Sequence, residues 1–233
     1  DECDLKKNIL VKKIICGIFV VAVLCIIAFS GCSSTTAKGT VELYNEAIKK
    51  TVEIRCSNVE DKIGYATGCV VSDNGEILTN KHVVFSGDAF FDKIEVRFYN
   101  SDNYISAVIA KISETDDLAL LKIDEPTNEY FLIGRTVAGG ERVYTIGNPN
   151  GYGLSFSEGV VSSPLRYVKY KGETIKTTQT SITINEGNSG GPLFNAKGEL
   201  IGVVTFRLRT VSGSILNGMS FALHYSIVGH FIQ

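Results

Sequence analysis

The chain has 233 residues, of which 44% are apolar and 21% charged, close to the globular average, so disorder and fibrous repeats are excluded. With 23 Lys and Arg against 25 Asp and Glu, the net charge of -2 gives no electrostatic reason to bind nucleic acid. Many glycines and few prolines indicate many turns between strands, and no Cys or His spacing is typical of a metal site.

The first forty residues have the layout of an export signal. Four lysines precede the apolar run Ile14–Phe29, and no further charge follows until Lys38. A basic region, an apolar region and then small residues are typical of secretory signals. Ser30 and Gly31 stand before Cys32, and this arrangement resembles a bacterial lipobox, in which the cysteine is acylated and becomes the mature N-terminus.

Two other interpretations of this leader stay open, an uncleaved transmembrane anchor and simple secretion. A helix of sixteen residues spans roughly 25 Å, which is short of the ~30 Å hydrocarbon core of a bilayer. In every case the positive flank stays inside and the chain after Cys32 lies outside the cytoplasm. We therefore predict a leader or anchor over residues 1–31, a tether over 32–40 and one domain over 41–233, in the bacterial cell envelope.

Short strands dominate the pattern after the tether. Thr40 can cap a short helix over residues 40–48, and a closing helix is predicted over 225–232. Between them, short runs rich in β-branched residues are separated by turn residues. Six runs lie at 51–55, 66–71, 76–79, 94–98, 104–112 and 118–123, and six more at 142–146, 154–162, 174–181, 192–194, 199–206 and 220–223. Two groups of six strands predict an all-β sandwich or a pair of barrels.

Three stretches carry candidate catalytic residues. His82 stands in Leu-Thr-Asn-Lys-His-Val-Val, Asp117 in Asp-Asp-Leu-Ala-Leu-Leu, and Ser189 in Gly-Asn-Ser-Gly-Gly-Pro-Leu. A serine hydroxyl stays protonated at neutral pH, so it needs an imidazole as base. The imidazole needs a carboxylate to hold its tautomer and offset its charge. Glycines beside the serine let backbone N–H groups point at a developing oxyanion.

The order of these residues separates two fold families. His, Asp, Ser is the order of chymotrypsin-like proteases. Residues 187–191 also match the G-x-S-x-G motif of α/β-hydrolases, but that fold places its acid and its histidine after the serine. Only one acid, Glu199, follows Ser189. The hydrolase interpretation therefore fails.

The three stretches, together with Thr-Ile-Gly-Asn-Pro at 145–149, resemble the HtrA (Deg) branch of the trypsin-like serine proteases. The match covers roughly residues 41–225. It implies an all-β fold of two six-stranded antiparallel β-barrels, at about 50–133 and about 140–224, with short N-terminal and C-terminal helices. The active site would lie in the cleft between the barrels.

The resemblance also implies the role of each site residue. His82 and Asp117 would come from the first barrel and Ser189 from the second, as base, orienting carboxylate and nucleophile. The backbone N–H groups of Gly187, Asn188 and Ser189 would surround the oxyanion. Asp116 is the competing acid, but Asp117 directly precedes the strand and aligns with the motif.

Two departures from the family pattern bear on specificity and regulation. Family members usually carry PDZ domains after the protease domain, whereas here 44 residues follow Ser189, so we expect the protease domain only. Trypsin-type enzymes keep an acid six residues before the serine, where this chain has Thr183. We therefore predict a preference for small or medium apolar side chains, in a pocket lined by Thr183, Thr205, Phe206 and Phe221.

The remaining cysteines and histidines receive structural interpretations. Cys56 and Cys69 lie on successive strands whose midpoint falls near Lys62, so a cross-strand disulfide and two buried thiols are both open. His224 and His230, on the closing segment, are expected to have no catalytic role.

The sequence thus predicts a serine endopeptidase that hydrolyses exposed or misfolded polypeptides outside the cytoplasm. Its partners would be polypeptide substrates, the membrane through a lipid at Cys32 or an anchor, and a second copy if it forms a homo-oligomer. No nucleic acid, metal or cofactor is implied. The alternative is a non-catalytic polypeptide-binding or chaperone-like module on the same fold, and the complete set of three catalytic residues argues against it.

Overall fold

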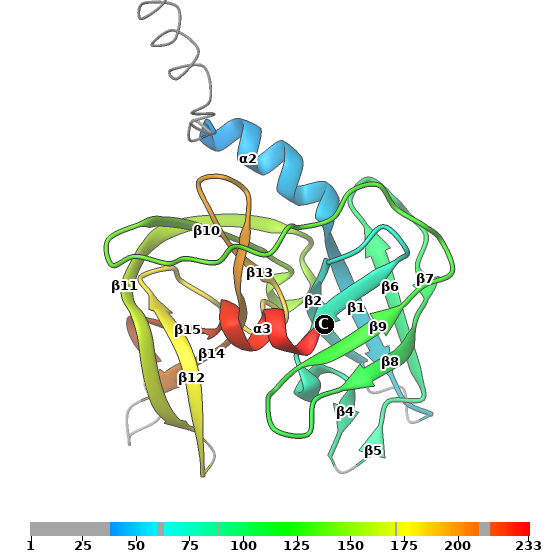
Figure 1. Cartoon of the computed structure of the whole chain (residues 1–233). Coiled ribbons are helices and arrows are strands. Elements are labelled where there is room, and N and C mark those ends of the chain that lie inside the picture. Colours follow the sequence, from blue (N-terminus) through cyan, green and yellow to red (C-terminus); the bar gives the residue numbers. More distant parts are fainter. Residues whose placement is uncertain (1–37, 60–62, 88, 171, 210–214) are drawn as a thin grey trace, which may run out of the picture. The chain divides into compact units, whose positions relative to one another are not determined.

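Two β-barrels and two short helices make up the part of the chain that the computed structural model describes, which is residues 38–59, 63–87, 89–170, 172–209 and 215–233 (Figure 1). The predicted leader over 1–31 and the predicted lipidation site Cys32 lie outside these residues. In the described part, no helix combines the length and the apolar character needed to span a bilayer.

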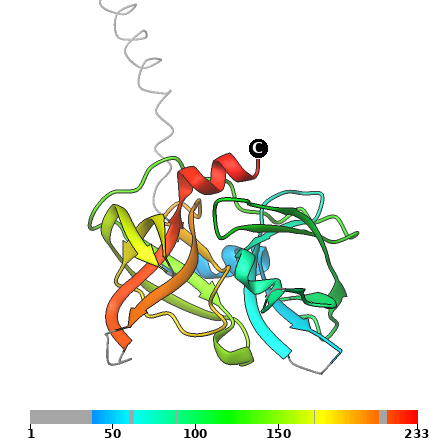
Figure 2. The same ribbon diagram turned by 90° about the horizontal axis from the view of Figure 1, so that it is seen from below.

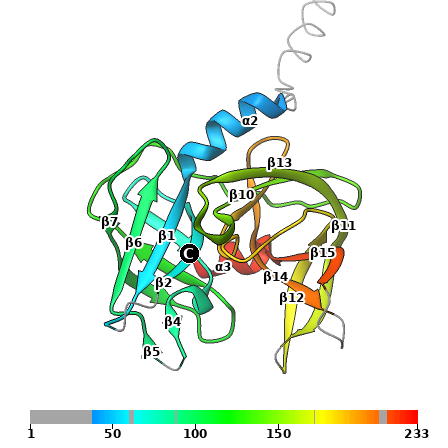
Figure 3. The ribbon, with the colours of Figure 1, turned by 180° about the vertical axis from the view of Figure 1, so that it is seen from behind.

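The helix α2 (Thr40–Ala47) opens the fold, as predicted, and runs into the 3-10 helix η1 (Ile48–Lys50). Its N-cap is Gly39 rather than the predicted Thr40, and no side chain caps it. Leu43 and Ala47 are buried, so α2 packs on the barrels through this face (Figure 3).

The N-terminal barrel is a strongly curved antiparallel sheet in the strand order β7-β6-β1-β2-β3-β9-β8. Its strands are β1 (Thr51–Ser57), β2 (Ile63–Val70), β3 (Glu76–Thr79), β6 (Lys93–Phe98), β7 (Ile105–Ser106), β8 (Val108–Ile112) and β9 (Ala119–Lys122). The short pair β4 (Phe85–Ser86) and β5 (Ala89–Phe90) forms a separate hairpin. The two edge strands β7 and β8 are consecutive in the chain, with only Ala107 between them, and they pair with opposite sides of the sheet. The segment 105–112 therefore closes the sheet into a six-stranded barrel, as predicted.

The C-terminal barrel is closed, in the strand order β10-β11-β12-β15-β14-β13. Its strands are β10 (Arg142–Gly147), β11 (Ser155–Tyr170), β12 (Glu173–Thr180), β13 (Pro192–Asn195), β14 (Leu200–Arg209) and β15 (Ile215–His224). The closing helix α3 (Tyr225–Phe231) follows β15, as predicted. Seen from below in Figure 2, α3 leaves this barrel and extends toward the other one. There Lys111 of β8 donates a hydrogen bond to the carbonyl of Phe231, at 2.5 Å.

Strand alternation explains how the two barrels are held together. On β2 and β3, Val70 and Ile77 point into the N-terminal barrel, whereas their neighbours Cys69 and Leu78 point out of it. These outward residues join one buried apolar cluster with Phe194 of the other barrel and with both helices. The shared cluster fixes the barrels relative to each other, and with them the two walls of the cleft.

The structure corrects the disulfide hypothesis for Cys56 and Cys69. The register of β1 and β2 places Cys69 opposite Thr51 and Cys56 opposite Gly64, so the two cysteines are not cross-strand partners. They also lie in different apolar clusters. Both are free, buried thiols, and burial raises the pKa of Cys56 to about 12.

Candidate active site

His82 and Asp117 meet at the edge of the N-terminal barrel. His82 lies in the 3-10 helix η2 (Lys81–Val83), just after β3 ends, and Asp117 lies in the turn before β9. The imidazole Nδ1 is 2.7 Å from Asp117 Oδ2, and the backbone N–H of His82 donates to Asp117 Oδ1 at 2.9 Å. Both carboxylate oxygens therefore hold the same histidine, and its other ring nitrogen, Nε2, is left for a further partner.

Two more residues hold Asp117 in place. The hydroxyl of Thr205, on β14 of the other barrel, donates to Asp117 Oδ2 at 2.8 Å, and the Asn80 amide donates to the Asp117 carbonyl at 2.9 Å. Burial alone would raise the pKa of the Asp117 carboxyl. The hydrogen bonds and charge of His82, with the bond from Thr205, outweigh burial and hold this pKa below its ordinary value. The carboxylate is thus ionised at neutral pH.

The competing acid Asp116 has a different role. Its carboxylate accepts a hydrogen bond from the Thr115 hydroxyl at 2.9 Å, and its backbone N–H donates to the Ser113 hydroxyl at 3.0 Å. Among the described contacts, only Asp117 binds the imidazole of His82. The choice of Asp117 over Asp116 is therefore consistent with this geometry.

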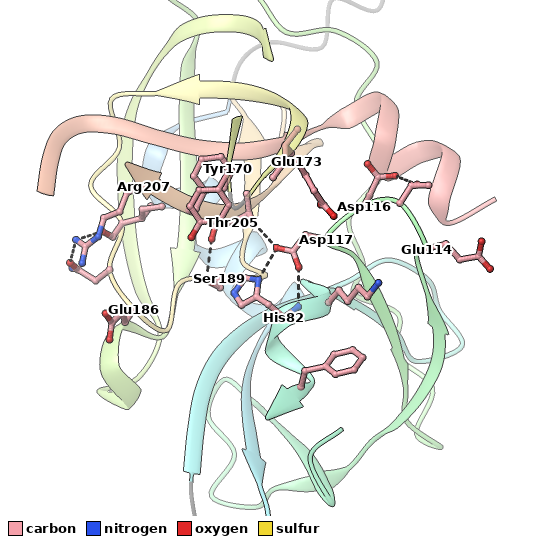
Figure 4. Close-up of a pocket in the computed structure, with 17 residues that line it drawn as sticks. His82, Glu114, Asp116, Asp117, Tyr170, Glu173, Glu186, Ser189, Thr205 and Arg207 are labelled. Carbon is pink, nitrogen blue, oxygen red and sulfur yellow. Dashed lines mark hydrogen bonds and ion pairs between the residues drawn. The ribbon is translucent and has the colours of Figure 1, made fainter. Parts of the chain in front are cut away.

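Ser189 lies in the turn between β12 and β13, on the C-terminal side of the cleft. Its hydroxyl donates to the carbonyl of Thr205 at 3.3 Å. Figure 4 shows that the side chains of Ser189, His82, Asp117 and Thr205 gather at one point of the cleft, two from each barrel. Hydrogen bonds in active sites are often long or misaligned when no substrate is bound.

The backbone before Ser189 leaves two amides available. The carbonyl of Glu186 accepts a hydrogen bond from the Asn150 N–H at 2.8 Å, so the N–H of Gly187, on the same trans peptide, points the opposite way. Within the described residues, the N–H groups of Gly187 and Ser189 donate to no protein acceptor. The Asn188 N–H instead donates to the Asn185 carbonyl at 3.1 Å, within the turn. This bond corrects the expectation that all three amides surround an oxyanion.

These side chains line a cleft of about 620 Å³. The N-terminal barrel contributes Lys81, His82, Phe85 and residues 114–117, and the C-terminal barrel contributes Tyr170, Glu173, Ile175, residues 184–186, Ser189 and residues 205–207. Of the predicted pocket residues, Thr205 and Phe206 line this cleft. Thr183 and Phe221 are not among its lining residues, and Phe221 is buried beneath Phe206, with ring centroids 5.1 Å apart.

Arg207 lines the C-terminal side of the cleft, the side that also holds Ser189. Its guanidinium Nη1 donates to the carbonyl of Ile184 at 2.9 Å and to the Asn185 side-chain oxygen at 3.1 Å. Residues 184–186 and 205–207 form two of the walls on this side of the cleft, which Tyr170, Glu173 and Ile175 also line. The Arg207 side chain thus bridges these walls (Figure 4).

The structure reveals contributors that sequence reasoning missed. Asn80 and Arg207 were not among the predicted site residues, and the bond from Thr205 to Asp117 was not anticipated. Asn80 stands inside the His82 motif, which is a usable signal. His224 caps α3 by accepting from the Ser226 N–H at 3.2 Å, which agrees with a structural role. In the described part of the chain, no group of three or more His, Cys, Asp or Glu side chains could hold a metal ion.

Comparison with known proteins points to one family. The family model described as trypsin-like peptidase domain matches residues 66–203. A probable periplasmic serine endoprotease, DegP-like, from Hahella chejuensis is 35% identical over 159 residues, which cover 67% of this chain and 32% of that protein. The serine endoprotease DegS from Haemophilus influenzae is 30% identical over 217 residues, which cover 89% of this chain and 60% of that protein. The chain therefore spans less than two thirds of the length of these relatives.

Solved structures give the same result. The HtrA-type protease AlgW with a tripeptide superposes with a TM-score of 0.74 at 27% identity, covering 84% of this chain and 63% of that one. A serine endoprotease from Yersinia pestis superposes with a TM-score of 0.68 at 29% identity, covering 84% of this chain and 65% of that one.

Proposed function

Because this chain belongs to the HtrA-like branch of the trypsin-like serine proteases, we propose that it is a serine endopeptidase that cleaves exposed or misfolded polypeptides outside the cytoplasm. One observation carries the proposal. The carboxylate of Asp117 is hydrogen-bonded to Nδ1 of His82 at 2.7 Å, in the same cleft as the hydroxyl of Ser189. A base that a carboxylate orients, beside a serine in a glycine-rich turn, is the arrangement that acyl transfer requires.

In the proposed mechanism, the Ser189 hydroxyl turns from the Thr205 carbonyl to Nε2 of His82 and attacks the peptide carbonyl. His82 takes the hydroxyl proton, and Asp117 stabilises the imidazolium that forms. The amides of Gly187 and Ser189 stabilise the negative oxygen of the tetrahedral intermediate, each contributing roughly 10²–10³ in rate. His82 then protonates the leaving amine. In the second half of the reaction, His82 takes a proton from a water molecule, whose oxygen attacks the acyl carbonyl. The bond to Ser189 then breaks, His82 returns the proton to the Ser189 oxygen, and the carboxylic acid product leaves.

The Arg207 bridge supports a substrate with a small side chain at the cleaved residue. When the substrate carbonyl lies at Ser189, the side chain of that residue enters the space between the walls 184–186 and 205–207. Arg207 connects these walls through two hydrogen bonds, to the carbonyl of Ile184 and to the side-chain oxygen of Asn185, and we infer that this connection limits the size of the side chain that can enter. Position 183 is a threonine in this chain, whereas a trypsin-type pocket has there an acidic residue that binds Lys or Arg. Small apolar residues therefore fit the proposal better than basic or large ones.

We propose the cell envelope as the location of this activity because the sequence predicts a leader over residues 1–31 and because a relative is named periplasmic. Attachment through a lipid at Cys32 is part of this proposal. Incorporation of radioactive palmitate by wild-type protein, and its loss in Cys32→Ser, is the expected result. Equal labelling of both proteins would contradict lipidation at Cys32.

The proposed activity can be tested with a single substrate protein, offered in an unfolded and in a folded state. The purified protein is incubated with reduced, carboxymethylated lysozyme, which cannot fold, and with the native disulfide-bonded protein. We expect fragments from the unfolded substrate only, and none with the Ser189→Ala variant. If the well-folded wild type cleaves neither substrate but retains the unfolded one on a column, the non-catalytic binding alternative replaces the proposed function.

A further inference from the structure

A buried threonine of the N-terminal barrel contacts the turn that carries the nucleophile. Thr67, on β2, is fully buried and uses every hydrogen-bonding group it has. Its backbone N–H donates to the Ser189 carbonyl at 3.0 Å, and its own carbonyl accepts from the Thr79 hydroxyl at 2.9 Å. Its hydroxyl donates to the Gly187 carbonyl at 2.7 Å and accepts from the Asn148 N–H at 2.9 Å. None of these bonds involves the imidazole of His82.

The hydroxyl of Thr67 completes a closed cycle of contacts. The hydroxyl donates to the Gly187 carbonyl, and the carbonyl of the preceding residue, Glu186, accepts from the Asn150 N–H. Asn148 lies in the same loop as Asn150, and its N–H donates back to the Thr67 hydroxyl. The loop and the turn are also in close contact, because a Cβ at Gly187 would lie 2.1 Å from the Asn148 carbonyl oxygen. The cycle therefore links a strand of one barrel to two loops of the other.

The cycle matters because a glycine backbone, without such restraints, can adopt more than one conformation. The φ of Gly187 is +93°, in the left-handed region, and glycine crosses between backbone regions with little steric cost. A rotation of the peptide between Glu186 and Gly187 would replace the Gly187 N–H by the Glu186 carbonyl on the side that faces Ser189. The Asn150 bond restrains that peptide, and the Thr67 bond restrains the next one. Together they keep the Gly187 amide directed at the oxyanion.

Resting on the proposed function, we propose that Thr67 is a positioning residue, whose hydroxyl holds the turn 186–189 in the arrangement that stabilises the oxyanion. Thr67 affects catalysis through its hydrogen bonds to Gly187 and Asn148, whereas the catalytic residues act on the reacting atoms themselves. It also gives the N-terminal barrel a second task in catalysis, besides supplying His82 and Asp117.

Removal of the hydroxyl without loss of volume tests this role. Thr67→Val leaves the Gly187 carbonyl and the Asn148 N–H without their hydrogen-bond partner in a buried site. Because an unsatisfied buried polar group costs free energy, the turn 186–189 is expected to rotate into a conformation that satisfies these groups. We expect kcat to fall by about 10- to 100-fold, somewhat less than for the loss of an oxyanion donor, with little change in KM. The inhibition constant of a peptide boronate, whose oxygen occupies the oxyanion position, should rise by the same factor. Thr67→Ser, which keeps the hydroxyl, should recover most of the rate.

The matched control is Thr51→Val. Thr51 is also fully buried, and its hydroxyl donates to the Ala47 carbonyl at 2.8 Å. This bond lies where the N-terminal helix meets β1, and Thr51 is not among the residues that line the cleft. If Thr67→Val loses no more kcat than Thr51→Val, if only KM changes, or if Thr67→Ser fails to recover the rate, the inference is wrong. Should Thr67→Val not fold, Thr67→Ala against Thr67→Ser gives the same comparison. An inactive wild type would instead overturn the proposed function itself.

Discussion

Gly190, the residue after Ser189, provides a test of how closely the two barrels pack against each other. Gly190 has a φ of +84°, and a Cβ added there would lie 2.1 Å from the Thr79 hydroxyl oxygen and 2.2 Å from the Thr67 carbonyl oxygen. Real Cβ contacts essentially never fall below 3.0 Å. The Thr67 carbonyl belongs to the backbone of β2 and cannot rotate aside, so Gly190→Ala must push the barrels apart locally.

The magnitude has two parts. A non-glycine residue in the left-handed region costs about 1–2 kcal/mol. Insertion of a methyl group into a packed site costs about 1–3 kcal/mol more. We therefore expect Gly190→Ala to lower the free energy of unfolding by roughly 2–5 kcal/mol, a large part of the ~5–15 kcal/mol of a typical domain.

Gly140 separates the two parts. Its φ is +79°, almost the same, but an added Cβ would meet no atom within 4 Å. Gly140→Ala should thus cost only the conformational part. The assay is urea unfolding followed by far-UV circular dichroism, since the chain contains no tryptophan, with the shift in midpoint read at constant m-value. Equal losses for the two variants would refute the contact argument.

Three further outcomes follow from the site and its surroundings. Thr205→Val removes a hydrogen bond to an ionised carboxylate, worth about 1.5–3 kcal/mol, so kcat should fall by about 10- to 100-fold, whereas Thr205→Ser should stay near wild type. Equal rates for both variants would contradict the role of this bond. In Arg207→Ala, the ratio of kcat/KM for peptides with Leu or Phe at the cleaved residue to kcat/KM for peptides with Ala there should rise by at least about tenfold. An unchanged peptide-library profile would show that the Arg207 bridge does not determine specificity. Burial, and then the charge of Lys176, lower the pKa of His224 in the folded chain. As the pH falls below the ordinary histidine pKa, the unfolded chain therefore binds more protons than the folded chain, and the free energy of unfolding decreases. His224→Asn, which keeps a capping side chain, should lose less melting temperature between pH 7.5 and pH 5.5 than wild type, and equal losses would show that His224 is not the group responsible.

The barrels and the central residues could be predicted because their signals are local. A histidine after a strand, an acid before a buried run and a serine among glycines can each be read within a few residues. Residues 118–121 are all apolar because β9 is buried on both faces there, with Leu121 inside the barrel and Leu120 in the shared cluster.

The features that escaped prediction depend on how distant strands align. The contact between Thr205 and Asp117 joins residues 88 positions apart and exists only because two barrels pack at one register. Of the two alternatives for Cys56 and Cys69, the disulfide was excluded for a related reason, because a hairpin turn displaced by a few residues changes every cross-strand pair. The long strand β11 was predicted to end at 162, but it passes Pro164 through register shifts near Ser163 and continues to Tyr170.

The measurement that tests the central claim most directly is covalent labelling of Ser189 by a fluorophosphonate, followed by intact mass. The account predicts one adduct per chain on the wild type, none on Ser189→Ala, and labelling of His82→Ala slowed by at least about 10⁴-fold. A well-folded wild type that acquires no adduct, or an adduct that survives Ser189→Ala, would contradict it.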